Sequence, residues 1–307
     1  MARSAVPQLA PEGTVAFAVA SAIGRRRLRI MRRSGLPAIL EKPLEFLLGR
    51  SLSTADACRV QAVERLRADM AKRNQERVGV YSETEEDENA TVGSRTLDEV
   101  AWISSVQPVW GAFLMLCAEA SGAKTILELG GATGISGCYL ASSPRCRRFV
   151  TIEGSSSRAK LATYHLATIA PYAEVVVDSF HHALDKLLPR LTDSLDLVYV
   201  DGSKSLRENV VLFDRISPHV NPGGVIIFDD IYWSTEMGQL WRRLCTTRGI
   251  AHAVNVGRMG VCVWLGGDVQ PHRHDLYKIA GVDLYGLRYR LESWRSNQDG
   301  ARWGREQ

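Results

Sequence analysis

The sequence predicts an α/β fold with a mostly parallel central sheet. Short apolar runs alternate with segments of helical pattern through the middle of the chain, and a glycine-rich turn follows the first of these runs. Most of the runs end directly before a carboxylate, at the place where open α/β sheets bind their ligands. A chain of 307 residues with 45% hydrophobic content can bury a full core and still carry an appendage.

The first apolar run leads from Ile126 into a glycine turn and then into a helix. Glycine lets the backbone approach a ligand closely, and the free N–H groups at the start of the helix point toward the same place. The candidate ligand-binding residues of this turn are Glu128, Gly130, Gly131, Gly134 and Ser136. Their spacing differs from the glycine pattern that seats a dinucleotide pyrophosphate, so we do not expect NAD.

The second and third runs each end in an acid. Glu153 comes 19 residues after Gly134, a natural βαβ distance for an acid that accepts both hydroxyls of a ribose. Asp178, followed by Ser179, ends the third run. Each acid alone could be a surface carboxylate, whereas acids in register behind one glycine turn argue for a shared ligand site.

The fourth and fifth runs end in three further acids, Asp201, Asp229 and Asp230. At adjacent strand ends these carboxylates would repel one another and raise one another's pKa values if they had no partner. We therefore expect a divalent cation there, and all-oxygen ligands favour Mg²⁺, Mn²⁺ or Ca²⁺ over zinc. The alternative for Asp230 is that it caps the helix that follows.

These motifs carry a resemblance to a known family. The pattern Glu128-x-Gly130-x-x-x-Gly134-x-Ser136 resembles the first motif of class I S-adenosylmethionine (SAM)-dependent methyltransferases. Asp201, with acids 28 and 29 residues later, resembles the metal site of catechol-type O-methyltransferases, and the segment that begins at Phe228 is similar to uncharacterised bacterial relatives. The resemblance implies a Rossmann-like, seven-stranded sheet with an antiparallel edge hairpin.

The resemblance also implies roles for the site residues. The acid and glycines of the first motif hold the methionine end of SAM, Glu153 binds the ribose and Asp178 lies beside the adenine. Lys204 matches the general base of the catechol type, and we expect its pKa to be lowered by desolvation and by the neighbouring cation. Asp230 stands where the catechol type has asparagine, which leaves the identity of the metal open.

The chain divides into three predicted parts. Residues 1–90 form a helical appendage that ends in an acidic loop, residues 91–266 form the methyltransferase domain, and residues 267–307 form a C-terminal extension. The acidic run 82–89 sets the first boundary. Six cysteines without paired spacing suit a reducing cytoplasm, and the apolar stretch before residue 25 is too short for a transmembrane segment.

The predicted function is transfer of a methyl group from SAM to a hydroxyl of a small molecule, with help from a divalent metal, in a protein that could be a homodimer. The arginine cluster at 25–33 keeps two alternatives open: an RNA or protein methyltransferase, and a non-catalytic SAM-binding interaction protein. Enzymes that methylate base or amide nitrogens commonly carry an Asn/Asp-Pro-Pro-aromatic turn where this chain has Asp201-Gly202-Ser203-Lys204. We therefore do not expect nucleic acid as the partner.

Overall fold

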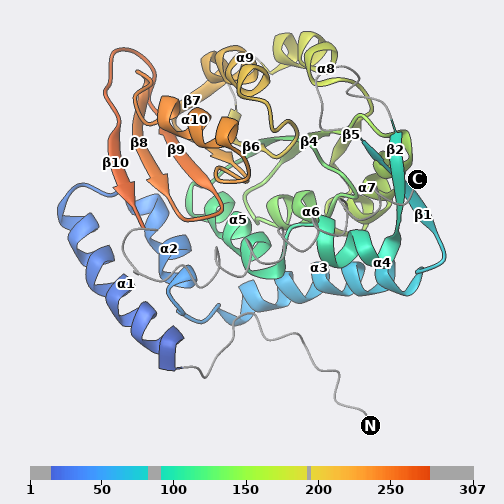
Figure 1. The fold of residues 1–307 in the computed structure, drawn as a ribbon, viewed down its shortest axis with the longest axis horizontal. Coiled ribbons are helices and arrows are strands. Elements are labelled where there is room, and N and C mark those ends of the chain that lie inside the picture. The colour runs from blue at the N-terminus through green and yellow to red at the C-terminus, as the bar shows by residue number, and fades with distance from the viewer. Residues whose placement is uncertain (1–14, 82–90, 192–194, 277–307) are drawn as a thin grey trace.

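The computed structural model describes residues 15–81, 91–191 and 195–276, and at its centre lies an eight-stranded sheet (Figure 1). The strand order is β10-β8-β9-β7-β6-β3-β4-β5. The parallel strands in the middle are β3 (Thr125–Leu129), β4 (Arg148–Ile152), β5 (Glu174–Val176), β6 (Leu195–Val200) and β7 (Val220–Phe228). Side chains on the inner strands are almost all buried, as a parallel sheet covered on both faces requires.

An antiparallel hairpin extends one side of the parallel strands, as the sequence predicts. Its strands are β8 (Ile250–Asn255) and β9 (Gly260–Trp264), and β9 pairs with β7. A further strand, β10 (His272–Asp275), adds to β8 in parallel and makes the sheet one strand wider than expected. This strand belongs to the segment that the sequence assigns to a C-terminal extension. Its residues alternate histidine with charged side chains, so the sequence has no apolar pattern that would predict a strand here.

Helices cover both faces of the sheet (Figure 1). Alternate strand residues feed two separate apolar cores, since Ile126 of β3 packs into one and Leu127 into the other. The first core is covered by α5 (Pro108–Ala120), α6 (Ile135–Ala141) and α7 (Ser156–Ile169). The second is covered by α8 (Phe180–Leu187), α9 (Leu206–Ile216) and α10 (Thr235–Leu244).

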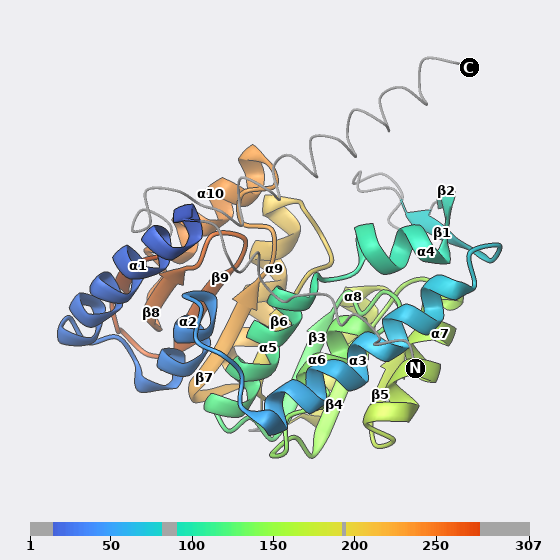
Figure 2. The same ribbon diagram turned by 90° about the horizontal axis from the view of Figure 1, so that it is seen from below.

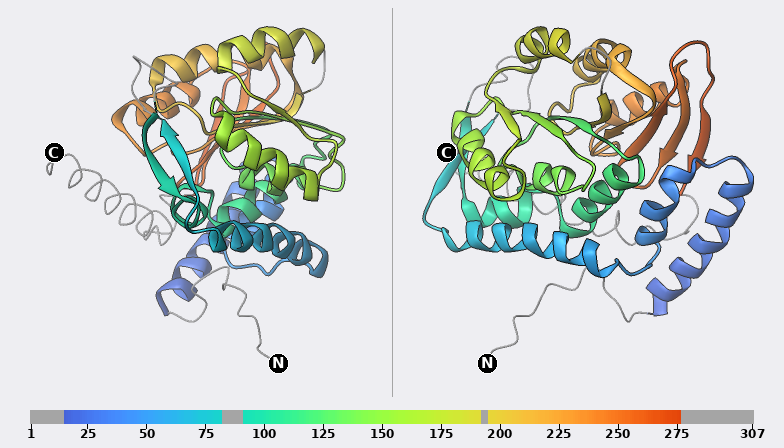
Figure 3. Two further views of the ribbon diagram at one scale, coloured as in Figure 1. Left: turned by 90° about the vertical axis from the view of Figure 1, so that its right-hand side faces the viewer. Right: turned by 180° about the vertical axis from the view of Figure 1, so that it is seen from behind.

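The N-terminal helices add an outer layer on the side of α5 and α6, as Figures 2 and 3 show. They are α1 (Val15–Arg33), α2 (Glu41–Leu47) and α3 (Thr54–Lys72), with a short 3₁₀ turn (Ala38–Leu40) before α2. Leu28 and Met31 of α1 are buried in the first core, so the basic helix is packed against the rest of the molecule. The predicted helical appendage is therefore present.

A hairpin and a broken helix connect this layer to the sheet. Strands β1 (Arg77–Tyr81) and β2 (Thr91–Thr96) pair across the predicted boundary at residue 90, whereas the acidic run 82–89 lies outside the described residues. Then follow α4 (Leu97–Glu99), which starts with a capping box at Thr96, and one π-helical turn (Val100–Ser104). In the described part of the chain no single helix is long and apolar enough to cross a membrane; the bent pair Leu97–Ser104 and Pro108–Ala120 passes that test only jointly, by length and composition.

Candidate functional site at the carboxyl ends of the parallel strands

The sequence-predicted acids form one row along the sheet. Glu153 follows β4, Asp178 lies just beyond β5, Asp201 follows β6 and Asp229 follows β7, while the glycine turn follows β3 in the centre of the row. After β3 the chain adds strands on one side, and after β5 it crosses to the other side. This topological switch point between β3 and β6 is where open α/β sheets bind ligands.

The glycine turn brings two strand ends into close contact. Gly130 has a φ of 92°, and a Cβ atom there would lie 2.6 Å from the backbone oxygen of Asp201. Gly134 has a φ of 83° and is the N-cap of α6, whose second residue is the buried Ser136. A Cβ atom at Gly131 would collide with Thr151. The glycines are thus required by the packing of the turn itself, in addition to any ligand.

Glu128 lies beneath this turn and is fully buried. Among the described residues, neither of its carboxylate oxygens has a hydrogen-bond partner. Burial raises the pKa of Glu128 to about 7, although the nearby Ser136 and Thr151 hydroxyls oppose the rise, and repulsion from Asp201 and Glu153 adds to it. A buried carboxylate without a partner is costly, and an ammonium group from a bound ligand would relieve it.

Glu153 is held in place by the backbone. One of its oxygens accepts a hydrogen bond from the Ala132 N–H, and the other accepts one from the Ser155 N–H, both at 2.8 Å. Ala132 belongs to the glycine turn and has a φ of 44°, so the carboxylate also fixes a strained residue. An ionised carboxylate can accept about four hydrogen bonds, which leaves capacity for the two hydroxyls of a ribose.

Asp178 and Ser179 already take part in the start of α8. Asp178 forms ion pairs with Lys186 at 3.0 Å and His182 at 3.2 Å, and these contacts, Lys186 first, lower its pKa. The Ser179 side chain accepts a hydrogen bond from the His182 N–H and caps the helix. Contact of either residue with an adenine ring stays a prediction.

The three acids at the ends of β6 and β7 converge as expected. One carboxylate oxygen from each of Asp201, Asp229 and Asp230 lies within 4.8 Å of the other two. Asp229 is fully buried, and Asp230 has a φ of 55°, in the left-handed region that is uncommon for residues other than glycine. The alternative role of Asp230 as a helix cap is wrong, because Ser234 caps α10.

Lys204 lies between two of these acids. Its ammonium nitrogen is 2.9 Å from Asp201 Oδ1 and 2.8 Å from Asp230 Oδ2. Burial disfavours the charged amine, but the attraction of Asp201, Asp230 and Asp229 outweighs burial and raises the pKa of Lys204 above its ordinary value. The expectation of a lowered pKa is therefore wrong for this arrangement. It assumed a neighbouring cation and did not include the carboxylates of Asp201 and Asp230, which are bonded to the ammonium group.

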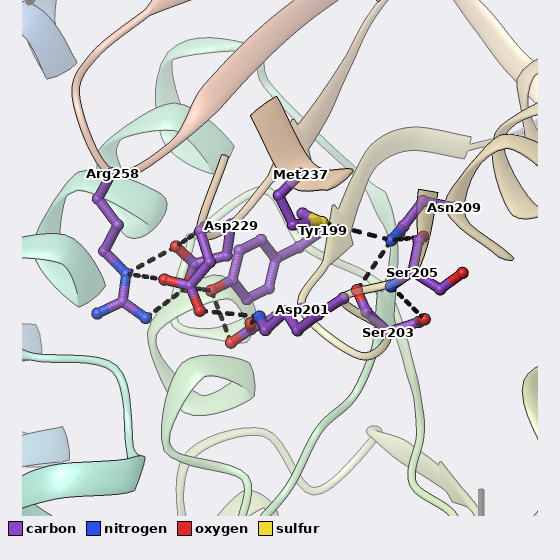
Figure 4. A network of polar contacts seen from close by, with 10 residues as sticks. Tyr199, Asp201, Ser203, Ser205, Asn209, Asp229, Met237 and Arg258 are labelled. Carbon is purple, nitrogen blue, oxygen red and sulfur yellow. Dashed lines mark hydrogen bonds and ion pairs between the residues drawn. The ribbon is translucent and has the colours of Figure 1, made fainter. Parts of the chain in front are cut away.

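Two residues that the sequence did not single out complete the cluster (Figure 4). The Arg258 guanidinium makes a two-point ion pair with Asp229, with Nε 2.7 Å from Oδ1 and Nη2 2.8 Å from Oδ2. The Tyr199 hydroxyl donates to Asp229 Oδ2 at 2.8 Å and lies 3.3 Å from Asp201 Oδ2. Tyr199 stands two residues before Asp201, so the sequence could have predicted that both side chains lie on the same face of the strand. The direction of the Arg258 side chain, by contrast, depends on the fold.

The acids fit a divalent metal in kind but not in arrangement. Three converging carboxylates are suitable ligands for Mg²⁺, Mn²⁺ or Ca²⁺. Both oxygens of Asp229, however, are already bonded to Arg258, and Oδ1 also accepts the Asp230 N–H at 2.7 Å. Asp229 can serve as a metal ligand only if Arg258 moves away.

The loop that carries Lys204 is tied at both ends. The Asn209 side-chain amide donates to the backbone oxygens of Ser203 and Ser205, each at 2.8 Å (Figure 4). Glu236 accepts the Leu206 N–H at 2.8 Å. These bonds come from α9 and α10 and fix the turn that follows Asp201. The ammonium group of Lys204 is therefore presented on a rigid loop at the switch point.

Comparison with known proteins agrees with this geometry. Residues 127–231 match a family model described as a methyltransferase domain. The chain is 34% identical over 124 residues to a catechol O-methyltransferase of Mycobacterium tuberculosis and 32% identical over 124 residues to a putative O-methyltransferase of Mycobacteroides abscessus. Each alignment covers 39% of this chain, and the chain spans about half the length of these relatives, 54% and 55%.

A solved O-methyltransferase from Bacillus cereus aligns with 69% of this chain and 92% of its own, at 18% identity and a TM-score of 0.46. The match to the family model includes the glycine turn and the acids at the ends of β6 and β7, and it ends before Arg258. The resemblance inferred from the motifs is therefore confirmed for residues 127–231, which match the methyltransferase-domain model.

Proposed function

We propose that this protein transfers a methyl group from SAM to a hydroxyl of a small molecule. The observation that carries the proposal is the position of Lys204 and the three clustered acids beside the glycine turn, at the switch point of the sheet. Methyl transfer from a sulfonium is an in-line displacement, so the protein mainly aligns the reacting atoms and removes a proton. The row of strand-end residues supports both tasks.

In this proposal the cofactor lies along the strand ends from β3 to β5. The turn residues Glu128, Gly130, Gly131, Gly134 and Ser136 surround its methionine end. Glu128 offers the unpaired carboxylate that an ammonium group would satisfy, and Glu153 offers the ribose its remaining hydrogen-bonding capacity. Asp178 and Ser179 lie at the place of the adenine. SAM supplies the methyl group, and the residues of this chain supply its orientation.

The acceptor lies on the other side of the switch point, beside Lys204. Lys204 takes the proton from the acceptor hydroxyl as a neutral amine, so it must first release its own proton to solvent. Its bonds to Asp201 and Asp230 keep the amine protonated, and they must loosen before that release. Tyr232 follows the acid cluster directly and is 45% exposed, and its hydroxyl accepts a hydrogen bond from Asn255 at 2.6 Å. A half-exposed ring held in this way suits a planar acceptor such as a phenol.

The divalent metal stays a prediction. Its ligands would be Asp201, Asp229 and Asp230, and it would lower the pKa of the acceptor hydroxyl. We assign no step to a metal, because the two-point ion pair of Arg258 with Asp229 occupies the oxygens that a metal would need.

Calorimetry with SAM and with its demethylated product tests the cofactor part of the proposal. We expect Glu153→Ala to weaken SAM binding by about tenfold to a hundredfold, because it removes a charged acceptor of hydrogen bonds. Glu174→Ala is the matched control, since this partly exposed carboxylate lies on β5, outside the row. Equal affinities in wild type and Glu153→Ala would contradict the proposal.

A screen of phenols and catechols with labelled SAM tests the acceptor part. We expect Lys204→Met to lose methyl transfer while it keeps SAM affinity, since the lysine lies at the acceptor side. Transfer to RNA or protein in the same assay, without transfer to any phenol, would favour the alternative methyltransferase classes.

A further inference from the structure

Arg258 occupies a position in the acid cluster that a bound cation would otherwise fill. Its guanidinium contacts Asp229 through two hydrogen bonds and lies 3.3 Å from Asp230 Oδ1. Asp229 is fully buried and Arg258 is 10% exposed, so the pair is shielded from solvent. A planar guanidinium matches a carboxylate with two parallel bonds, which makes this one of the stronger ion pairs available to a protein.

The backbone holds Arg258 at this position. The residue lies in the turn of the β8–β9 hairpin, where Gly257 has a φ of 98° and the Asn255 side chain accepts the Gly257 N–H at 2.9 Å. The Arg258 backbone oxygen accepts the Ile231 N–H at 3.0 Å, directly after the acid cluster. The hairpin turn and the strand end that bears Asp229 are thus joined by the main chain as well as by the side chain.

The remaining bonds of Asp229 come from groups that cannot be exchanged for a ligand easily. Its Oδ2 accepts from the buried Tyr199 hydroxyl, and its Oδ1 accepts from the Asp230 N–H. A metal ion that used Asp229 would have to displace Arg258 and leave a guanidinium without its carboxylate in a buried place. The loss of such a partner is strongly unfavourable.

From these contacts we propose that Arg258 is the built-in cation of the acid cluster and takes the place of a divalent metal. The cluster of Asp201, Asp229 and Asp230 then binds divalent cations weakly as long as Arg258 is present, and removal of the guanidinium creates a metal site. Weak binding of divalent cations by this cluster does not depend on the proposed function. Its consequence does rest on that function: methyl transfer should need no added metal.

The test uses Mn²⁺ as the probe, because the loss of the signal of free Mn²⁺ in electron paramagnetic resonance reports binding directly. For the wild type in the full chain we expect a dissociation constant above about 1 mM, at the weak end for carboxylate cation sites. For Arg258→Met, which keeps the unbranched stem of the side chain without the charged guanidinium, we expect binding of one ion at least about tenfold more tightly.

Two further variants make the result specific. Arg242→Met removes an exposed arginine of α10 and should behave as the wild type. Asp229→Asn in the Arg258→Met background should abolish the gain, because it removes the carboxylate that the guanidinium had covered. Circular dichroism establishes that each variant is folded.

The proposal fails if the wild type binds one Mn²⁺ with a dissociation constant below about 100 μM, a range typical of dedicated sites. It also fails if folded Arg258→Met binds no more tightly than the wild type. The wild-type measurement decides even if the variant does not fold. SAM calorimetry in the presence of a chelator separates this outcome from the proposed function, since failure to bind SAM would overturn the methyltransferase and leave the Mn²⁺ result intact.

Discussion

Two buried groups in this protein use the same three kinds of side chain, an arginine, a carboxylate and a tyrosine. In the first group Arg67 Nε lies 3.0 Å from both oxygens of Glu64, and the Tyr139 hydroxyl donates to Glu64 at 2.6 Å. The other guanidinium nitrogens donate to the backbone oxygens of Ala101 and Val106. One cation faces one acid, and the donors left over are used by the main chain.

The second group combines Arg258, Asp229 and Tyr199 in the same way but adds two more acids and Lys204. It is also more open, because the Asp201 side chain keeps 23% of its surface exposed. The comparison shows that the residue types do not decide the role. A closed, charge-matched group holds segments of the fold together, whereas an acid-rich group at an open edge can respond to a ligand.

The largest expected change in stability concerns the closed group of Arg67, Glu64 and Tyr139, and it tests whether this group is structural. We expect Arg67→Met to lower the free energy of unfolding by about 3–5 kcal/mol, because it leaves the Glu64 charge buried without its partner. Urea denaturation measures the loss. The double variant Arg67→Met/Glu64→Gln is the control and should recover part of it, and a loss below about 1 kcal/mol, the range of surface ion pairs, would show that the group is not structural.

Glu128 provides a contrast to the acids of both groups, because among the described residues neither oxygen of this buried carboxylate has a hydrogen-bond partner. Its folded pKa of about 7 lies above the ordinary 4.5, so the folded state binds the proton more tightly than the unfolded state does. Stability is therefore lost as pH rises from 4.5 to 7, by about 3 kcal/mol in total.

We expect Glu128→Gln to be more stable than the wild type at pH 8 by up to that amount and equal to it at pH 4. Urea denaturation across this pH range measures the difference, and Glu174→Gln at a partly exposed site is the control. Identical pH profiles for wild type and Glu128→Gln would mean that the carboxylate has a partner in solution.

The two tyrosines allow a matched test of structure against function. Tyr139→Phe and Tyr199→Phe should each lower the free energy of unfolding by about 1–2 kcal/mol, because each removes one hydrogen bond to a buried carboxylate. Only Tyr199→Phe should also lower kcat for methyl transfer. Equal loss of kcat in both variants would remove the functional distinction between the two groups.

The smallest stability effect is expected at the exposed end of the row. The ion pairs of Asp178 lie near the surface, so Asp178→Ala should change the free energy of unfolding by less than about 1 kcal/mol. SAM affinity should fall by about tenfold if Asp178 contacts the adenine, since one hydrogen bond is lost. Unchanged affinity in calorimetry would restrict Asp178 to its role at the start of α8.

The fold and the row of acids could be predicted because parallel strands bring the residues after them to one edge of the sheet. The charge state of Lys204 could not, because it depends on how many carboxylates reach the ammonium group. Arg258 could not be singled out either, because nothing in Gly257-Arg258-Met259 tells which way the side chain points. Strand β10 was missed because strand recognition relies on apolar alternation, which His272–Asp275 lacks.

The matched segment, residues 127–231, contains neither of the two buried groups in full. It includes Tyr139 and Asp229, while Glu64 comes from α3 and Arg258 from the β8–β9 turn. A fragment cut to those limits would lose Glu64 and Arg67 of the first group and Arg258 of the second. The stretch of chain that keeps both buried groups intact is therefore wider than the match to the family model.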